Sequence, residues 1–307
     1  MSCSAARVLR CTVPIVAVLR DHSPAPTLVV LAAGRACRYG AVKPLAPVGP
    51  AGEAVIDLLA DDASAAGFAR LVLVVSPATG PMIREHVAHR WPSDIEVAFA
   101  EQSHARGTAP ATLAARPYVD PRSPFAVSNA DDVYGRPALR QLAEHLAAGP
   151  TSCLVGYRLD RSLVGEDPVS RGICQTDGSR LTVVTERRQV RRAPAGFTAA
   201  DGLEPANLDP ASIVSMNLWG FRPEAWTALA AAIHDTVSDD EVLLPVVVAD
   251  LLTAGRLSID VLPTEEWCVG VTHPGDLEPA RLALREQIAS GRRPAHLFTG
   301  HMARQRG

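Results

Sequence analysis

The sequence predicts an α/β fold in which a mostly parallel central sheet carries helices on both faces. Two observations lead to this prediction. Several short apolar runs have the length of buried strands and show no alternation, and helical segments separate them along the chain, as in a parallel sheet covered on both sides. The 307 residues, 47% of them hydrophobic and 21% charged, are enough for one large domain of this kind.

The first half of the chain alternates strands and helices. Thr27–Ala32 is a continuous apolar run closed by Gly34, and the helix at Glu53–Ala66 is stopped by Gly67. A proline opens the helix at Pro137–Ala148. Further strands are expected at 71–75, 95–100 and 125–128, and further helices at 81–90 and 109–116.

After Pro150 the sequence predicts a small β-rich region on the substrate side. Strands are expected at 152–157, 172–175 and 181–185, followed by an irregular insert rich in Pro, Ala and Gly at 191–210. Strands at 213–221 and 257–262 and helices at 223–233, 240–253 and 276–290 complete the chain. We predict one domain over 27–290, a disordered extension at 1–26 and a frayed basic tail at 291–307.

Composition excludes several classes of function. The net charge is −3, from 30 basic and 33 acidic residues, so a nucleic-acid binder is not expected. No apolar run approaches the roughly 18–20 residues that a membrane helix needs. The six cysteines are scattered without a C-x-x-C pair, which favours neither a disulfide framework nor a zinc site and indicates a reducing, cytoplasmic location.

Lys43 is the only lysine in the chain, since the other 29 basic residues are arginines. A bias toward arginine explains the 29 but not the single exception. An ammonium is a compact point charge that a planar guanidinium does not replace in a tight site. Lys43 is therefore a candidate functional residue on composition alone.

The loop after the first strand has the composition of a polyphosphate site. Small residues at Ala32, Ala33 and Gly34 allow backbone N–H groups to approach an anion, at the end of a strand where open α/β sheets bind ligands. Arg35, Arg38 and Lys43 add three cations within nine residues. The alternative is a structural loop with chance arginines.

Two further segments are candidates for chemistry. Asp131 and Asp132 follow the strand at 125–128, where carboxylates are suited to hold Mg²⁺ beside a polyphosphate; alternatively they form an Asx turn or cap the following helix. The Gln102 amide has groups that pair with a base edge, and Gly107 allows close approach of a base. Thr108 either joins that site or only caps the helix after it.

These motifs, in this order, resemble those of the sugar-1-phosphate nucleotidyltransferases, or NDP-sugar pyrophosphorylases. The resemblance runs over about residues 27–285. It rests on Leu31-Ala32-Ala33-Gly34, Arg38-Tyr39-Gly40, Lys43-Pro44, Gln102 with Gly107-Thr108-Ala109, Asn129-Ala130-Asp131-Asp132, Val184-Thr185-Glu186-Arg187 and Met216-Asn217-Leu218-Trp219-Gly220-Phe221.

The resemblance implies a Rossmann-like nucleotide-diphospho-sugar transferase fold, with an NTP, a sugar 1-phosphate and Mg²⁺ as ligands. It implies that Arg38, Lys43 and Asp131 are catalytic and that Glu186 and Asn217 hold sugar hydroxyls. Ala32, Ala33, Gly34, Arg35, Gln102, Gly107 and Thr108 would bind the nucleotide, and Asp131 and Asp132 the metal. One departure stands out, because the late segment 267–272, where many members carry a second metal aspartate, has no carboxylate.

Two other functions stay open at this point. A glycosyltransferase of the same fold would use the two aspartates to hold a metal on a sugar nucleotide, and a regulatory homologue would keep the fold without activity. The motifs specify neither the base nor the sugar or cyclitol; the resemblance favours uracil or thymine and leaves guanine open. A homo-oligomer is compatible with the sequence, and neither a membrane nor a nucleic acid is expected as a partner.

Overall fold

The computed structural model describes residues 25–34, 42–104, 106–194, 196–234, 241–271 and 273–299. The extension expected at 1–26 therefore lies almost wholly outside the described residues. Arg35 and Arg38 of the expected phosphate loop also lie outside them.

The central sheet is mixed, not mostly parallel as the sequence predicted. Strands β1 (Thr27–Leu31), β2 (Arg70–Val75), β3 (Val97–Glu101) and β4 (Phe125–Asn129) are parallel neighbours, as are β6 (Ser152–Arg158) and β12 (Ile259–Pro263). Strand β11 (Ile213–Phe221) lies between β4 and β6 and runs antiparallel to both. The reversal arises because antiparallel hairpins, not a crossover helix, connect β6 to β11.

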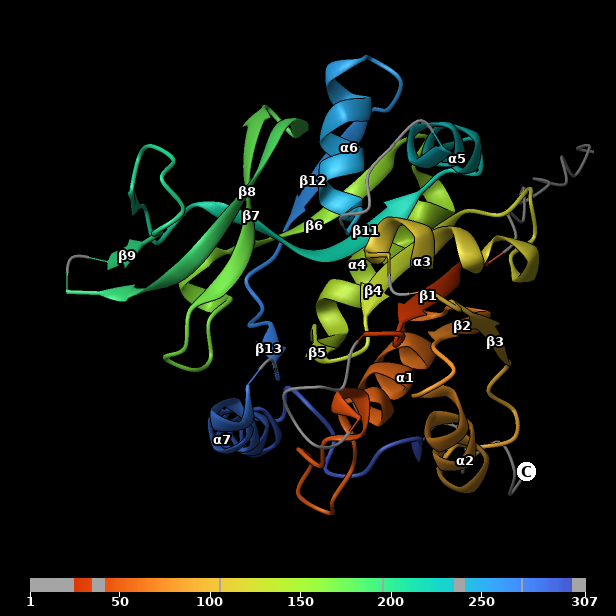
Figure 1. Ribbon diagram of the computed structural model, residues 1–307. Coiled ribbons are helices and arrows are strands. Elements are labelled where there is room, and N and C mark those ends of the chain that lie inside the picture. The colour runs from red at the N-terminus through yellow and green to blue at the C-terminus, as the bar shows by residue number, and fades with distance from the viewer. Residues whose placement is uncertain are drawn as a thin grey trace, which may run out of the picture.

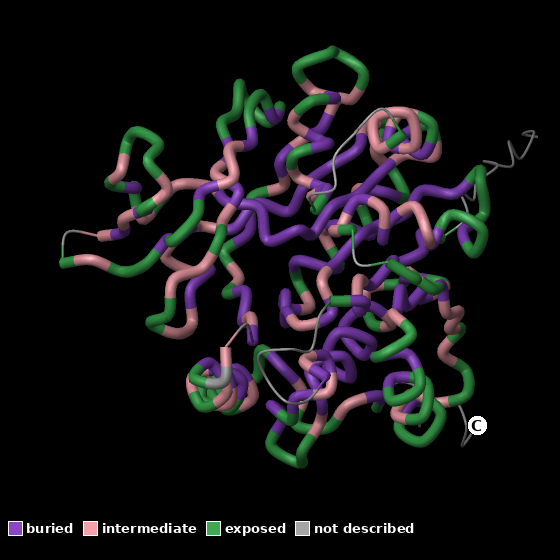
Figure 2. The backbone as a smooth tube through the Cα atoms, viewed as in Figure 1, coloured by how far each residue is buried: buried purple, intermediate pink, exposed green. Residues whose placement is uncertain are grey.

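Helices cover both faces of the sheet, as predicted (Figure 1). Successive residues of β1 point to opposite sides, so that Leu28 and Val30 belong to one core cluster and Val29 to another. The first cluster packs against α1 (Val55–Ala66), α2 (Gly80–Arg90) and α4 (Arg136–Ala148). The second packs against α3 (Thr108–Ala114), α5 (Ala225–His234) and α6 (Leu244–Thr253). The buried residues accordingly lie along the strands and on the inner faces of the helices (Figure 2).

An antiparallel arm projects from the sheet beyond β6 and β11 (Figure 1). It consists of β7 (Val169–Asp177), β8 (Arg180–Ala193), β9 (Gly196–Thr198) and β10 (Asn207–Leu208). The prediction of an irregular insert at 191–210 is therefore wrong in part, since this stretch completes β8 and forms β9 and β10. The arm is anchored by Arg187, which is buried and paired with Asp201 at 2.8 Å.

Short elements complete the fold. A two-stranded ribbon pairs β5 (Asp132–Val133) with β13 (Val269–Gly270). Single turns of 3₁₀ helix occur at η1 (Lys43–Leu45), η2 (Arg116–Tyr118), η3 (Leu159–Arg161) and η4 (Pro274–Asp276). Within the part of the chain that the structure describes, no helix is both long and apolar enough to cross a membrane.

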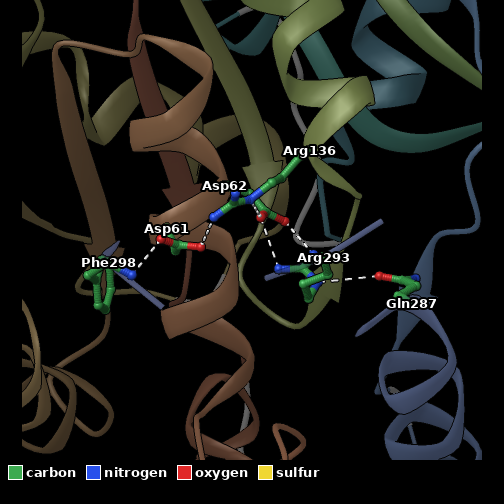
Figure 3. A network of polar contacts seen from close by, with 6 residues as sticks. All are labelled: Asp61, Asp62, Arg136, Gln287, Arg293 and Phe298. Atoms are coloured by element: carbon green, nitrogen blue, oxygen red, sulfur yellow. Dashed lines mark hydrogen bonds and ion pairs between the residues drawn. The ribbon is translucent and has the colours of Figure 1, made fainter. Parts of the chain in front are cut away.

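Polar contacts join α1 to the described part of the segment that follows α7 (Leu277–Ala289) (Figure 3). Arg293 is buried and donates two hydrogen bonds to the Asp62 carboxylate, at 2.9 and 2.5 Å. Arg136, at the start of α4, pairs with the same carboxylate and with Asp61. The backbone N–H of Phe298 donates to Asp61 at 2.7 Å. We call these contacts between Asp61, Asp62, Arg136, Arg293 and Phe298 the C-terminal clasp.

Candidate active site

The candidate site lies where β1 and β4 end side by side. Leu31, the last residue of β1, is in parallel register with Asn129, the last residue of β4. Parallel strands that end together leave a crevice at their carboxyl ends, and the loops that follow them supply its side chains. Asp131 and Asp132 follow β4 after Ala130, and the fold brings Asp131 to the same cavity as Ala33 and Gly34, which follow β1.

Two cavities meet at this edge of the sheet. One, of about 270 Å³, is lined by Leu31, Ala33, Gly34, Gln102, Gly107, Thr108, Ala111, Asn129, Asp131, Glu241 and Leu243. We call it the loop-side cavity. The other, of about 210 Å³, is lined by Thr108, Asn129, Asp131, Asp132, Ser170, Arg171, Gly172, Glu186, Ser215, Met216, Asn217, Leu243 and Pro245. We call it the arm-side cavity. Asp131 and Asn129 are among the residues that line both.

A chain of hydrogen bonds fixes the polar wall of the arm-side cavity. The indole N–H of Trp219 donates to Asn217 at 2.8 Å, the Asn217 amide donates to Asn129 at 2.8 Å, and the Asn129 amide donates to Asp132 at 2.8 Å. Asn217 has φ of +61°, a left-handed conformation that asparagine tolerates well, where the register of β11 with β6 is broken. This irregularity places the Asn217 side chain at the cavity.

The electrostatics of the site centre on the two aspartates. Burial and the neighbouring Asp132 carboxylate raise the pKa of Asp131 to about 7, and the charge of Lys43 opposes this shift. Burial also raises the pKa of Asp132, against the hydrogen bond from Asn129. Lys43 acts on both carboxylates, so the sole lysine of the chain is close to the predicted metal aspartates. Two neighbouring carboxylates repel each other when both are ionised, and a bound cation would lower that repulsion.

The donor set suits magnesium better than a metal held entirely by protein. Among the described residues, no three His, Cys, Asp or Glu side chains cluster as ligands. Mg²⁺ commonly takes one or two carboxylates and completes its shell with water and phosphate oxygens. Gly270 pairs with Asp132 across β13 and β5, so the segment that lacks the second aspartate does lie beside the first pair. Asp132 does not cap α4, whose N-cap is Gly135.

The loop-side cavity has a wall built by Gln102 and Gly107. The Gln102 side chain donates to the Gly107 carbonyl at 3.1 Å, which orders the turn before α3. The Thr108 hydroxyl does not cap α3 but accepts from the N–H of Leu244, the first residue of α6, at 2.8 Å. Ala33 and Gly34 line this cavity. Ala32 does not, and its N–H is committed to the Val74 carbonyl at 2.8 Å.

Replacing Gly107 with alanine is expected to lower the free energy of unfolding by more than about 1–3 kcal/mol and to weaken nucleotide binding. Gly107 has φ of +98°, and a Cβ there would lie 2.4 Å from the Val242 carbonyl oxygen, so strain and a backbone clash add. Urea denaturation and NTP titration measure the two effects. Gly255→Ala is the control, because Gly255 also has positive φ but, among the described residues, no atom lies within 4 Å of an added Cβ. Equal losses in both variants would contradict the clash.

The arm contributes Glu186 to the site, but not Arg187. Glu186 lines the arm-side cavity opposite Gly172, and a Cβ on that glycine would lie 3.5 Å from the Glu186 carboxylate. Burial raises the pKa of Glu186. Arg187 is fully engaged with Asp201 and with the carbonyls of Leu203 and Pro205. It is therefore a structural anchor of the arm.

Sequence reasoning missed the roles of Asn129 and Arg171. Asn129 links Asp132 to Asn217, and no local pattern indicates a bridge between strands that lie 88 residues apart in the chain. Arg171 lines the arm-side cavity, but as one of 29 arginines it has nothing in the sequence to distinguish it.

The sheet order, the crevice at the strand ends and the paired aspartates define a nucleotidyltransferase-like α/β protein. The model of the MobA-like NTP transferase domain family matches residues 28–235. The chain belongs to this family, and the predicted nucleotidyltransferase class is confirmed. Comparison with curated protein sequences gives no match.

Two solved structures share the fold. The inositol-1-phosphate CTP transferase from T. maritima superposes with a TM-score of 0.64 at 15% sequence identity, over 88% of this chain and 98% of that one. HddC from Yersinia pseudotuberculosis, determined in complex with GMP-PN, superposes with a TM-score of 0.59 at 16% identity, over 84% of this chain and 99% of that one. At these identities the likeness establishes the fold.

Proposed function

We propose that this enzyme joins an NTP to a sugar or cyclitol 1-phosphate and releases pyrophosphate. The observation that carries the proposal is the pair of cavities that share Asp131 and Asn129. A transferase that joins two substrates needs both reacting groups beside one another, and two adjoining cavities supply this proximity. The fold shared with an inositol-1-phosphate CTP transferase supports an acceptor of this class.

In the proposed reaction, a phosphate oxygen of the acceptor attacks the α-phosphorus of the NTP. A new P–O bond forms, and the bond between the α-phosphorus and the bridging oxygen breaks, so that pyrophosphate leaves with that oxygen. The loop-side cavity would hold the nucleotide, with Gln102 and Gly107 at the base. The arm-side cavity would hold the acceptor, with Glu186 and Asn217 at its hydroxyls. Phosphoryl chemistry of this kind depends on positioning and on charge neutralisation.

Asp131 and Asp132 would hold Mg²⁺ between the cavities. When bound, the ion supplies Lewis-acid stabilisation of the charge on the reacting phosphates. Lys43 would place its ammonium between the α-phosphate and the incoming phosphate, since it already acts on both carboxylates. Arg38, outside the described residues, is proposed from the sequence to hold the triphosphate.

A matrix of five NTPs against a panel of sugar and cyclitol 1-phosphates, scored for pyrophosphate, tests the proposal. Release that depends on both substrates is the expected result. Release of a free nucleoside diphosphate from an NDP-sugar, with no pyrophosphate from any pair, would identify the glycosyltransferase alternative instead. Repeating the productive pair with EDTA, and then with Mg²⁺ restored, tests the metal requirement.

Lys43→Arg is expected to cost about 2–3 kcal/mol of transition-state stabilisation, or about 10²-fold in kcat/KM. The charge is retained, but a guanidinium is wider than an ammonium and does not direct a single donor between two converging phosphates. Kinetics with both substrates measure the effect, and a melting curve controls for folding. Near-normal kcat in the variant would show that the lone lysine has no special role.

A further inference from the structure

Arg171, which is partly buried, differs in its partners from the buried arginines Arg187 and Arg293. Arg187 and Arg293 are buried and each is paired with a carboxylate. Arg171 donates instead to neutral acceptors, the hydroxyl and carbonyl of Ser162 and the carbonyl of Ser170. Among the residues that the structure describes, no carboxylate forms an ion pair with it. Neutral acceptors thus hold the guanidinium in place.

Arg171 lies close enough to the acidic groups of the arm-side cavity to interact with them electrostatically. Its charge lowers the pKa of Asp131, Asp132 and Glu186, all of which line that cavity. Burial lowers the pKa of Arg171 itself, and the charges of Asp132, Glu186 and Asp276 oppose this shift. A bound phosphate would add hydrogen-bond acceptors and negative charge at the guanidinium.

The cavity otherwise has little to attract a phosphate. Three carboxylates line it, and they would repel a dianion unless cations stood on the same wall. Lys43 acts on the aspartates, and Arg171 lines the cavity itself. Arg187, the cross-strand partner of Arg171 in β7 and β8, is not available, because Asp201 and two carbonyls occupy its guanidinium.

We propose that Arg171 binds the phosphate group of the acceptor substrate and, with Lys43, holds it beside Asp131. The inference rests on the proposed function, since it assigns the arm-side cavity to the acceptor. The Ser162 and Ser170 contacts orient the guanidinium in advance, so that binding requires little reorganisation. The cavity therefore selects phosphorylated over unphosphorylated sugars or cyclitols.

Direct binding to Arg171→Gln tests this role separately from turnover. The probes are myo-inositol 1-phosphate, glucose 1-phosphate and inorganic phosphate, with myo-inositol and glucose as unphosphorylated partners, measured by calorimetry. We expect the wild type to favour a phosphorylated probe, and Arg171→Gln to weaken that probe by about 10–100-fold with NTP affinity within about twofold. This range corresponds to losing one charge-assisted contact.

Arg192→Gln is the matched control. Arg192 donates to the carbonyl of Leu163, the residue after the Ser162 that Arg171 contacts. Arg192 does not line the arm-side cavity. The Arg192→Gln variant should bind every probe as the wild type does. If Arg192→Gln weakens the phosphorylated probes as much as Arg171→Gln does, loop anchoring explains the effect and the proposal is overturned. Unchanged phosphate binding in Arg171→Gln overturns it as well.

A second variant and a comparison with the turnover assay complete the test. If Arg171→Gln does not fold, Arg171→Lys replaces it; a phosphorylated probe weakened by at least threefold, with NTP binding unchanged, supports the role, and unchanged binding overturns it. If the wild type releases no pyrophosphate with any acceptor, the proposed function fails. Phosphate binding that depends on Arg171 would still establish the anion site in that case, so the two failures are distinguishable.

Discussion

Asp131→Asn is expected to lower kcat by about 10³-fold or more, and Asp132→Asn by much less. Losing the charge at Asp131 removes a carboxylate that lines both cavities, and metal stabilisation of a reacting phosphate accounts for several kcal/mol. Asp132 is already committed to the Asn129 amide, and an asparagine oxygen still accepts that hydrogen bond. Excess Mg²⁺ should partly restore the Asp131 variant.

The measurement is kcat as a function of Mg²⁺ concentration for the wild type and both variants. Melting curves serve as the control for folding, because removing one of two crowded carboxylates should not destabilise the protein. Small and equal effects of the two substitutions, with no change in Mg²⁺ dependence, would show that these residues are not the metal ligands.

Arg293→Met is expected to lower the free energy of unfolding by about 3–5 kcal/mol, the usual loss when a buried ion pair is left with one partner. Among the described residues, Asp62 would keep Arg136, which also pairs with Asp61 (Figure 3). Arg292→Met is the matched control, because Arg292 is exposed and donates a hydrogen bond to the Ser290 hydroxyl at 3.0 Å. It should change stability by less than about 0.5 kcal/mol.

The pH dependence of this loss identifies its cause. Burial raises the pKa of Asp62 from 3.8 even with Arg293 present, and removing the arginine raises it further. A carboxyl with a raised folded-state pKa costs stability as the pH rises through that pKa. The deficit of Arg293→Met in urea denaturation should therefore be larger at pH 8 than at pH 5. A deficit independent of pH would assign the loss to packing, and Asp62→Asn in the Arg293→Met background should then bring no recovery.

Most helices and strands could be predicted, because apolar runs and their Gly and Pro boundaries are local signals. Strand β11 was predicted at 213–221 and lies at Ile213–Phe221. Its direction could not be predicted, since periodicity carries no information on which way a strand runs. The arm was underestimated because β8 is rich in arginine on its exposed positions, and a largely polar strand resembles an irregular insert.

The residues of the candidate site could also be predicted in part, but the contacts that orient them could not. Lys43, Asp131, Glu186 and Asn217 belong to short motifs, and the fold brings them to one edge of the sheet. The contacts that orient them depend on chain segments distant in sequence, as when Asn129 meets Asn217. Arg171 and Arg187 show the limit most clearly: adjacent strands carry the same residue type, and only the partners in the folded protein separate a cavity residue from a structural anchor.

The C-terminal clasp also bears on how the protein is made. Asp62 and Arg293 are separated by 231 positions, so a ribosome completes α1 long before it synthesises the arginine that neutralises this aspartate. Until then, docking α1 in its final place buries a carboxylate with an incomplete set of partners. A nascent chain or a prematurely terminated product should therefore keep this helix loosely held and open to proteases. We therefore expect β1, α1 and β2 to pack stably after translation has passed residue 293.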